Sequence, residues 1–427
     1  MTLRLRHLTA LARAALVAAC LVSSCVAVAD KQRIEFWTQS LSPKFDDYFR
    51  NLVARYNAAH PEVDVVWVDY PWDVIRTKFT VAIASGHPPA LVNMNVPWAN
   101  DYKQLRLIQP VDKWIDKSQY LPNSVEDLTF DDGHVYAFPF YTGAHVIAYN
   151  TTLFKAAGLD PKRPPTSLDE VLAFSKQIKA KTGAAGFGPA LGPTKIEGLM
   201  MEEGLPVLQN GRAVFNSPAH VAFVNKLADA YRAGALLKDN LFGQDNFQVS
   251  MGAYNSGRLA ILRTVPSSLI RVRDDAPDIY KVTAVAGAPL GPTQIAPGGW
   301  QFNYVVARNV DPKLLPAIGQ FGNYLTNAEN QLVFCQLAGT LPTARQTAAD
   351  PYFHDVPAGG SLIERGVVAA AHNLDYTHTL FLANVRDPEM LSTKLSSAVE
   401  QAVTGRRDAK AALDDAVQFW NQKLARR

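Results

Sequence analysis

The chain has 427 residues, 48% of them hydrophobic and 19% charged, which excludes a disordered or low-complexity chain, a coiled coil and a peptide-sized scaffold. Its 42 basic and 39 acidic residues leave a net charge of only +3, so nucleic acid is not an expected partner. The length is sufficient for two or three compact lobes.

The first 29 residues have the order of a secretory signal peptide. Three arginines, the last of them Arg13, precede an apolar run over residues 14–22, and small residues ending in Ala29 lead into Asp30. The run is about half as long as a bilayer-spanning helix requires. We therefore expect cleavage after Ala29 and export of an electrically neutral, soluble domain to the periplasm. The alternative is a lipoprotein signal, in which Cys25 carries a lipid anchor.

Cys335 is the one cysteine that lies outside this signal. A single thiol forms no intramolecular disulfide, so the core must supply the stability. Because Cys335 directly follows Leu332, Val333 and Phe334, we interpret it as a small buried hydrophobic residue rather than a reactive thiol.

Strand and helix patterns alternate directly after the signal. We expect strands over residues 34–37, 63–68 and 90–94, with helices between them that begin near Ser42 and Val74. Alternation of this kind with short connections predicts a parallel sheet with helices on both faces.

Three later helices have clear start signals. Ser167 and Glu170 form an expected capping box, while Ser217 and Asp311 each precede a proline at the first helical position. A single sheet over this length would exceed the usual size of a domain. We therefore expect two sheets, in two lobes between which the chain crosses more than once.

Motifs for nucleotide binding and catalysis are absent from the sequence. It has no Gly-x-x-x-x-Gly-Lys loop, no Gly-x-Ser-x-Gly elbow, and no His and Cys at metal-ligand spacing, so we expect no cofactor and no metal. The adjacent acids Asp131, Asp132 and Glu202, Glu203 are interpreted as solvated surface, because neighbouring side chains point apart.

Large aromatic residues recur where the predicted strands end. Trp37 ends the first strand, Trp72 and Trp98 follow the second and third, and Tyr141 and Trp300 lie in stretches rich in Pro or Gly. Strand ends in an open parallel sheet form the crevice where ligands bind. A flat ring there can stack on the C–H face of a sugar while amide side chains bond its hydroxyls. For Trp37, burial within the lobe is the favoured interpretation.

A series of short segments follows a recognisable order and spacing: residues 36–38, 56–61, 84–90, 107–112, 133–139, 148–159, 215–218, 255–260, 298–300 and 339–345. Together they resemble the extracellular solute-binding proteins of ABC sugar importers, the family that includes maltose-binding protein. The most specific segments are 133–139 and 148–159. This chain departs from the family at Ala90, where Asp is usual.

The resemblance implies an α/β fold of the type-2 periplasmic-binding kind, in which two lobes joined by hinge crossings close around a ligand cleft. By position, the hinges lie near residues 138–145, 286–290 and 338–345. The first lobe would comprise residues 30–140 with 290–338, and the second lobe residues 145–286 with 345–427.

The resemblance also implies ligand contacts from both lobes, carried over position by position: Gln39, Ser40, Trp72, Asn95, Trp98, Tyr141, Gly143, Glu202, Gly299, Trp300 and Arg345. Where relatives often have an aromatic residue, this chain has Thr264 followed by Val265. This difference favours a smaller or more polar ligand than a long oligosaccharide.

The implied function is the periplasmic substrate-binding component of an ABC importer. It would bind a sugar or a related polyhydroxylated solute and deliver it to a membrane permease whose ATPase is a separate chain. We expect a monomer with no enzymatic activity. Two alternatives stay open: an exported carbohydrate-active enzyme, such as a glycosidase or lyase, and a ligand-sensing protein that feeds a receptor.

Overall fold

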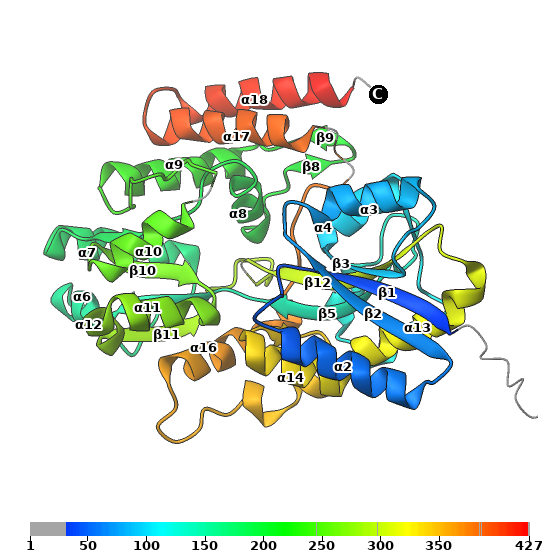
Figure 1. Cartoon of the computed structure of the whole chain (residues 1–427). Coiled ribbons are helices and arrows are strands. Elements are labelled where there is room, and N and C mark those ends of the chain that lie inside the picture. Colours follow the sequence, from blue (N-terminus) through cyan, green and yellow to red (C-terminus); the bar gives the residue numbers. More distant parts are fainter. Residues whose placement is uncertain (1–30, 245, 297, 384, 386, 426–427) are drawn as a thin grey trace, which may run out of the picture.

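Two α/β lobes lie side by side in the computed structural model (Figure 1), which describes residues 31–425 except 245, 297, 384 and 386. The predicted two-lobed α/β fold is confirmed. The predicted signal peptide lies outside the described residues. Within the described residues, no helix combines the length and apolar content needed to cross a bilayer.

The first lobe is built on a seven-stranded sheet with the order β13-β5-β12-β3-β1-β2, in which β4 also pairs with β12. Its strands are β1 (Gln32–Gln39), β2 (Val63–Tyr70), β3 (Leu91–Asn95), β4 (Ile108–Gln109), β5 (Ala137–Gly143), β12 (Trp300–Ala307) and β13 (Leu341–Pro342). The predicted parallel pairing is confirmed for β1 with β2 and β3. The remaining pairs, which the predicted alternation did not cover, are antiparallel: β12 pairs with β3, β4 and β5, and β13 pairs with β5. The reason is that β12 enters from the second lobe and needs no crossover helix.

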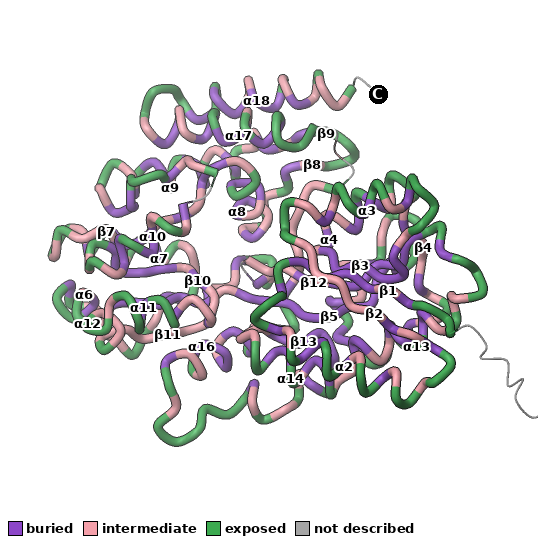
Figure 2. Tube along the Cα trace, viewed as in Figure 1, coloured by how far each residue is buried: buried purple, intermediate pink, exposed green. Residues whose placement is uncertain are grey.

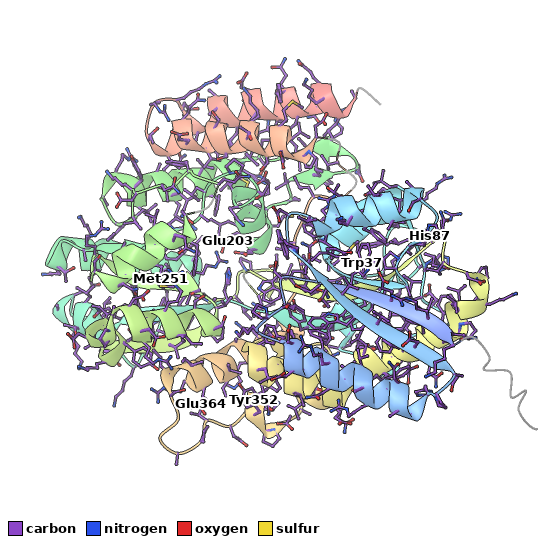
Figure 3. All side chains as sticks on the ribbon, in the orientation of Figure 1. Trp37, His87, Glu203, Met251, Tyr352 and Glu364 are labelled. Carbon is purple, nitrogen blue, oxygen red and sulfur yellow. The ribbon has the colours of Figure 1, made fainter. Side chains whose placement is uncertain are left out.

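Helices cover both faces of this sheet because successive side chains of β1 point in opposite directions. Phe36 contacts Phe49 and Phe321 on one face, and Trp37 contacts Phe79 on the other. Trp37 is 5% exposed and lies among the first-lobe side chains (Figure 3), so its predicted burial is confirmed. The helices of this lobe are α2 (Asp46–Ala59), α3 (Ile75–Ala84), α4 (Val96–Gln104), α5 (Pro122–Glu126), α13 (Leu315–Leu325), α14 (Ala328–Ala338) and α15 (Arg345–Ala348).

The helix predicted to begin near Ser42 starts later, at Asp46. The Asp69 carboxylate on β2 accepts hydrogen bonds from the backbone N–H groups of Leu41 (3.1 Å) and Ser42 (3.2 Å). These bonds anchor residues 41 and 42 to β2, so the chain forms a turn there and α2 begins after it.

The second lobe contains a four-stranded sheet with the order β11-β6-β10-β7. On β6, Ile147 and Tyr149 pack with Phe154 and Ile178 on one face, while Ala148 faces the opposite cluster. The strands are β6 (Val146–Asn150), β7 (Ala185–Phe187), β10 (Leu259–Thr264) and β11 (Thr283–Gly287). The helices around them are α6 (Thr151–Ala156), α7 (Leu168–Thr182), α10 (Phe247–Asn255), α11 (Leu269–Asp275), α12 (Pro277–Lys281) and α16 (Leu362–Ala371).

A helical cluster extends the second lobe and forms a separate core around Trp420. The Trp420 indole N–H donates to the carbonyl oxygen of Leu391 (2.7 Å), which joins the two C-terminal helices at the top of Figure 1. The cluster consists of α8 (Ile196–Glu202), α9 (Pro218–Arg232), α17 (Pro388–Val403) and α18 (Ala409–Leu424), beside a hairpin of β8 (Leu208–Gln209) and β9 (Arg212–Ala213). Figure 2 shows buried residues along the central strands of both lobes and exposed residues on the outer helices.

The predicted caps are present at two of the three helix starts and half formed at the third. Ser217 accepts from the backbone N–H of His220, and Asp311 accepts from that of Lys313. Ser167 caps α7 through the Glu170 N–H, but the Glu170 carboxylate bonds the backbone of Thr166 instead of Ser167, so the reciprocal box is not formed.

The chain passes between the two sheets after Gly143, where β5 ends, and again before Trp300, where β12 begins. A later stretch also contacts the first lobe: the Asn123 side chain donates to the carbonyl oxygens of Leu374 (2.9 Å) and Thr377 (2.7 Å). The predicted hinge positions and lobe boundaries stay a prediction.

Cys335 is fully buried in the core of the first lobe. Burial raises the pKa of its thiol to about 12, which removes the thiolate that reactivity requires. The predicted structural role is confirmed.

Candidate functional site

A cavity of about 420 Å³ lies between the two lobes. This volume falls within the roughly 300–1,000 Å³ typical of small-molecule sites. The first sheet and its links contribute His145, Gly298, Gly299, Trp300, His378 and Leu380 to the wall. The second lobe contributes Gly188, Ala190, Thr194, Lys195, Gly198, Leu199, Glu202, Asn246, Phe247, Ser250 and Arg263.

Trp300 forms part of the wall at the first position of β12, directly after the two glycines that precede it. Its ring lies against the backbone of Gly143, where a β-carbon would lie 2.5 Å from two ring atoms. The Thr142 hydroxyl donates to the Trp300 carbonyl oxygen (2.7 Å) and fixes the strand at this point. Gly298 precedes the strand with φ = 68°, and a side chain there would overlap the His145 ring.

A row of aromatic rings leads from the cavity along the first lobe. The centroid distances are 5.6 Å from Trp300 to Phe302, 5.7 Å from Phe302 to Trp72, and 4.8 Å from Trp72 to Trp98. Tyr141 stacks on Phe302 at 5.2 Å with an interplanar angle of 20°. The structure therefore brings four of the predicted rings into one row, of which Trp300 lines the cavity.

The second-lobe wall holds an ion pair between Glu202, the last residue of α8, and Arg263 on β10. Their side chains are only 10% and 21% exposed. The other Glu202 carboxylate oxygen accepts from the backbone N–H of Gly298 at 3.2 Å. The interpretation of Glu202 as solvated surface is thus wrong, because the carboxylate faces a guanidinium across the cavity wall and not bulk water.

The pKa values of two histidines in the wall are shifted in opposite directions. Burial, together with the positive charges of Arg263 and Lys195, lowers the pKa of His145 to about 3, so its ring is neutral at ordinary pH. His378 contacts Asp127 (Nδ1 to Oδ1, 2.8 Å), and this hydrogen bond raises the pKa of His378.

Of the eleven predicted ligand residues, Glu202, Gly299 and Trp300 line this wall and eight do not. Four of those eight are Trp72, Trp98 and Tyr141 of the ring row and Gly143, which lies against Trp300. The other four are polar. Gln39 is 4% exposed, and its amide atoms have no hydrogen-bond partner among the described residues. The Ser40 hydroxyl accepts from the backbone N–H of Trp72, and Asn95 caps α4 through that of Trp98. Arg345 is exposed on α15 and donates to the carbonyl oxygen of Tyr120.

Sequence reasoning missed Lys195, Arg263 and the two histidines. Arg263 had a detectable signal, because it is the one charged residue in the otherwise apolar strand β10. A cation at such a position is rarely buried without a partner or a ligand. Lys195 and the histidines carry no local pattern that would have indicated the cavity.

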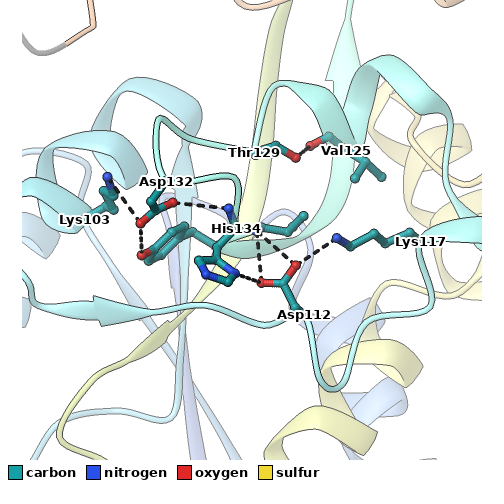
Figure 4. A network of polar contacts seen from close by, with 9 residues as sticks. Lys103, Asp112, Lys117, Val125, Thr129, Asp132 and His134 are labelled. Atoms are coloured by element: carbon teal, nitrogen blue, oxygen red, sulfur yellow. Dashed lines mark hydrogen bonds and ion pairs between the residues drawn. The ribbon is translucent and has the colours of Figure 1, made fainter.

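The second pair of adjacent acids lies at the surface, as predicted, within a polar network (Figure 4). Lys103 pairs with Asp131 and Asp132, and Asp132 accepts from the Tyr136 hydroxyl (2.7 Å) and the His134 backbone N–H (3.2 Å). In the described part of the chain, no group of three or more His, Cys, Asp or Glu residues is arranged to hold a metal ion.

Two α/β lobes with an aromatic and charged cavity between them define a two-lobed solute-binding protein. The chain belongs to the family described as bacterial extracellular solute-binding protein, whose model matches residues 51–358. The predicted class, the solute-binding component of an ABC importer, is confirmed, and with it the expectation of an exported protein.

Known relatives are binding proteins rather than enzymes. The sn-glycerol-3-phosphate-binding periplasmic protein UgpB of Salmonella typhimurium is 25% identical over 418 residues, which cover 92% of each chain. Among solved structures, the cyclic α-maltosyl-1,6-maltose binding protein of Arthrobacter globiformis has a TM-score of 0.75 at 19% identity, covering 92% of this chain and 99% of its own. An ABC transporter solute-binding protein of Thermotoga lettingae, bound with α-D-tagatose, has a TM-score of 0.63 at 19% identity, covering 92% of this chain and 100% of its own.

Proposed function

We propose that this protein binds a small polyhydroxylated solute in the cavity between its lobes and delivers it to a membrane permease. The observation that carries the proposal is the cavity wall, where the Trp300 ring and the polar groups of Glu202 and Arg263 converge from different lobes. A ring and a few oriented polar groups are what a sugar or polyol requires. The relatives, which include binders of glycerol 3-phosphate, tagatose and a cyclic maltosyl-maltose, support this class of solute.

The predicted ligand residues outside the wall would contact the solute when the lobes close. Gln39 is buried with free amide atoms, and Trp72 and Trp98 continue the ring row from Trp300. We propose that Gln39, Ser40, Trp72, Asn95, Trp98, Tyr141 and Gly143 join the lining residues Gly299 and Trp300 on the first-lobe side of the site, with Arg345 at its margin.

Closure follows from contacts that a bound solute makes with both lobes at once. A ligand shifts a conformational equilibrium only by the difference between its affinities for the two states. A shift from 1% to 99% closed requires about 5.5 kcal/mol of differential binding, which several hydrogen bonds and one stacked ring can supply. The closed form is then the form that a permease recognises.

We further propose that the protein acts as a monomer, is released to the periplasm by cleavage after Ala29, and returns its solute chemically unchanged. The alternative to cleavage after Ala29 is attachment of a lipid anchor at Cys25.

The alternative functions are a secreted glycosidase or lyase and a sensor that feeds a membrane receptor. A glycosidase would need two carboxyl groups facing each other across the cavity. Among the described residues that line it, Glu202 is the one carboxylate, and Arg263 pairs with it.

A thermal-shift screen of the mature protein against sugars, polyols and their phosphate esters tests the proposal. A solute at 100 times its Kd adds about 2.7 kcal/mol of apparent stability. Trp300→Ala should remove the shift of the best solute and leave the unliganded fold intact, while Phe419→Ala, on α18 outside the cavity, should keep the shift. Chromatography of the incubated solute provides the second readout, because new reducing ends would contradict a binding function.

A further inference from the structure

The charged groups in the cavity wall carry an excess of positive charge. Lys195 and Arg263 line the cavity from the second lobe, and Glu202 is the one carboxylate in the described part of the wall. Because Glu202 pairs with Arg263, the charge of Lys195 is left without a counterion in the wall. No ion pair of the Lys195 ammonium is present among the described residues.

Arg263 keeps donors available despite its pairing. One guanidinium nitrogen donates to Glu202, and the other Glu202 oxygen is used by the Gly298 backbone N–H. A guanidinium has five N–H donors, so most of them stay free for a ligand. The ion pair therefore orients Arg263 toward the cavity and does not exhaust its hydrogen-bonding capacity.

The opposite wall holds His378, paired with a carboxylate. His378 follows the stretch that Asn123 holds against the first lobe, and its hydrogen bond to Asp127 favours the protonated ring. The neighbouring His145 ring is neutral, because burial and the two second-lobe cations disfavour its charged form. The lysine and the arginine that line the cavity, Lys195 and Arg263, thus both belong to the second lobe.

We infer that the solute of this protein carries an oxyanion, a carboxylate or a phosphate ester, which Lys195 and Arg263 bind. This inference rests on the proposed solute-binding function and specifies its ligand. Guanidinium and ammonium groups bind oxyanions through charge-assisted hydrogen bonds, which are stronger than bonds to neutral hydroxyls. Arg263 is only 21% exposed, so its attraction to an anion is screened less than at the open surface, whereas Lys195 lines the cavity as an exposed residue.

An anion in this position would also promote closure. Lys195 and Arg263 lie on the second lobe, while Trp300 and Gly299 line the cavity from the first lobe, so an anion held by the two cations can contact both lobes at once. A neutral sugar lacks the charge-assisted bonds on the second-lobe side. The anionic solute therefore gains the differential affinity for the closed form that drives the population shift.

Calorimetry with matched pairs of solutes tests this inference. The pairs are glucose with glucuronate, glucose with glucose 6-phosphate, and glycerol with glycerol 3-phosphate, so that the members differ in the anionic group and the two sources of charge are separated. We expect the anionic member of at least one pair to bind ten to one hundred times more tightly than its neutral counterpart. Its Kd should rise between 50 and 500 mM salt, because salt screens the attraction.

Lys195→Gln should cancel this preference and leave the affinity for the neutral member within about twofold. Lys181→Gln, an exposed lysine on α7 outside the cavity, is the matched control and should change neither. Because Arg263→Gln alone would leave Glu202 buried without its partner, the paired variant Glu202→Gln with Arg263→Gln tests the second cation. It should also reduce the preference for the anion.

Equal affinity for charged and neutral members, or an unchanged preference in Lys195→Gln, overturns the anion inference while the solute-binding function stands. An equal loss of affinity for both members in Lys195→Gln also overturns it, because that result indicates a structural role. The absence of heat with every solute of the panel contradicts both the inference and the proposed function.

Discussion

The contact between Gly143 and Trp300 permits a test of how the cavity wall is built. A β-carbon at position 143 would lie 2.5 Å from the Cε2 and Cζ2 atoms of Trp300. Carbon atoms in ordinary contact are about 3.5–4.0 Å apart, so the ring must move by about 1 Å or more. Gly143→Ala thus displaces the ring that lines the cavity without adding a group that touches the solute.

The cost follows from overpacking at a buried position. Gly143 and the neighbouring Tyr141 are both buried, and Tyr141 contacts the other side of Trp300 at 5.7 Å. Insertion of a methyl group in such surroundings costs about 1–3 kcal/mol of folding free energy. Trp300→Ala removes the ring that the methyl group would strike, so Gly143→Ala should cost little in a chain that already carries Trp300→Ala.

Urea unfolding of the four proteins in this double-mutant cycle measures the coupling. We expect an interaction energy of about 1 kcal/mol or more, because the two residues are in direct contact. Calorimetry with the best solute should show weaker binding to Gly143→Ala than to the unmodified protein. Additive stability effects within about 0.5 kcal/mol would refute the reasoning, since they would mean that Trp300 does not occupy the space beside Gly143.

Three further predictions concern titratable groups. Burial raises the pKa of Glu197, so this carboxyl lowers the folding stability increasingly as the pH rises above the unfolded pKa of glutamate, and most fully above the raised folded value; Glu197→Gln should stabilise the protein by about 1 kcal/mol at pH 7, and the gain should vanish as the pH falls below the unfolded value in urea unfolding experiments. Asp127 raises the pKa of His378, so this contact stabilises the fold below the unfolded pKa of histidine and loses its effect as the pH rises through the raised value; Asp127→Asn should therefore destabilise more at pH 6 than at pH 9. Cys335 should resist a thiol reagent in the native protein at pH 8 and react fully in urea, and rapid native labelling would contradict its burial.

The elements of the first lobe could be predicted where local pattern decides the structure. The predicted strands at residues 63–68 and 90–94 correspond to β2 and β3 within two residues. The start of α2 could not be predicted, because Asp69, which holds the preceding turn, lies 27 residues away from Ser42. The antiparallel β12 was also beyond local pattern, since its direction depends on where the chain returns from the second lobe.

Only part of the site could be predicted, because local sequence reveals some of its residues and long-range pairing determines the others. Trp300 belongs to a segment whose residue order resembles a known family, and it lines the cavity. The charges of the opposite wall depend on long-range pairing: Arg263 meets Glu202 across 61 residues, and each residue alone is an ordinary surface type. The pairing of distant residues thus determines the chemistry of the cavity, while local sequence determines its scaffold.

Helix α8 connects solute recognition with the link between the lobes. Its last residue, Glu202, pairs with Arg263 and accepts from the Gly298 N–H, and its backbone carbonyl accepts from the Thr293 hydroxyl at 2.9 Å. Both Gly298 and Thr293 belong to the link from β11 to β12. A solute that draws Lys195 and Arg263 toward it therefore acts on the helix that holds this link. Because only contacts that differ between open and closed forms shift the equilibrium, closure should depend on the Glu202 contacts to the link as well as on direct bonds to the solute.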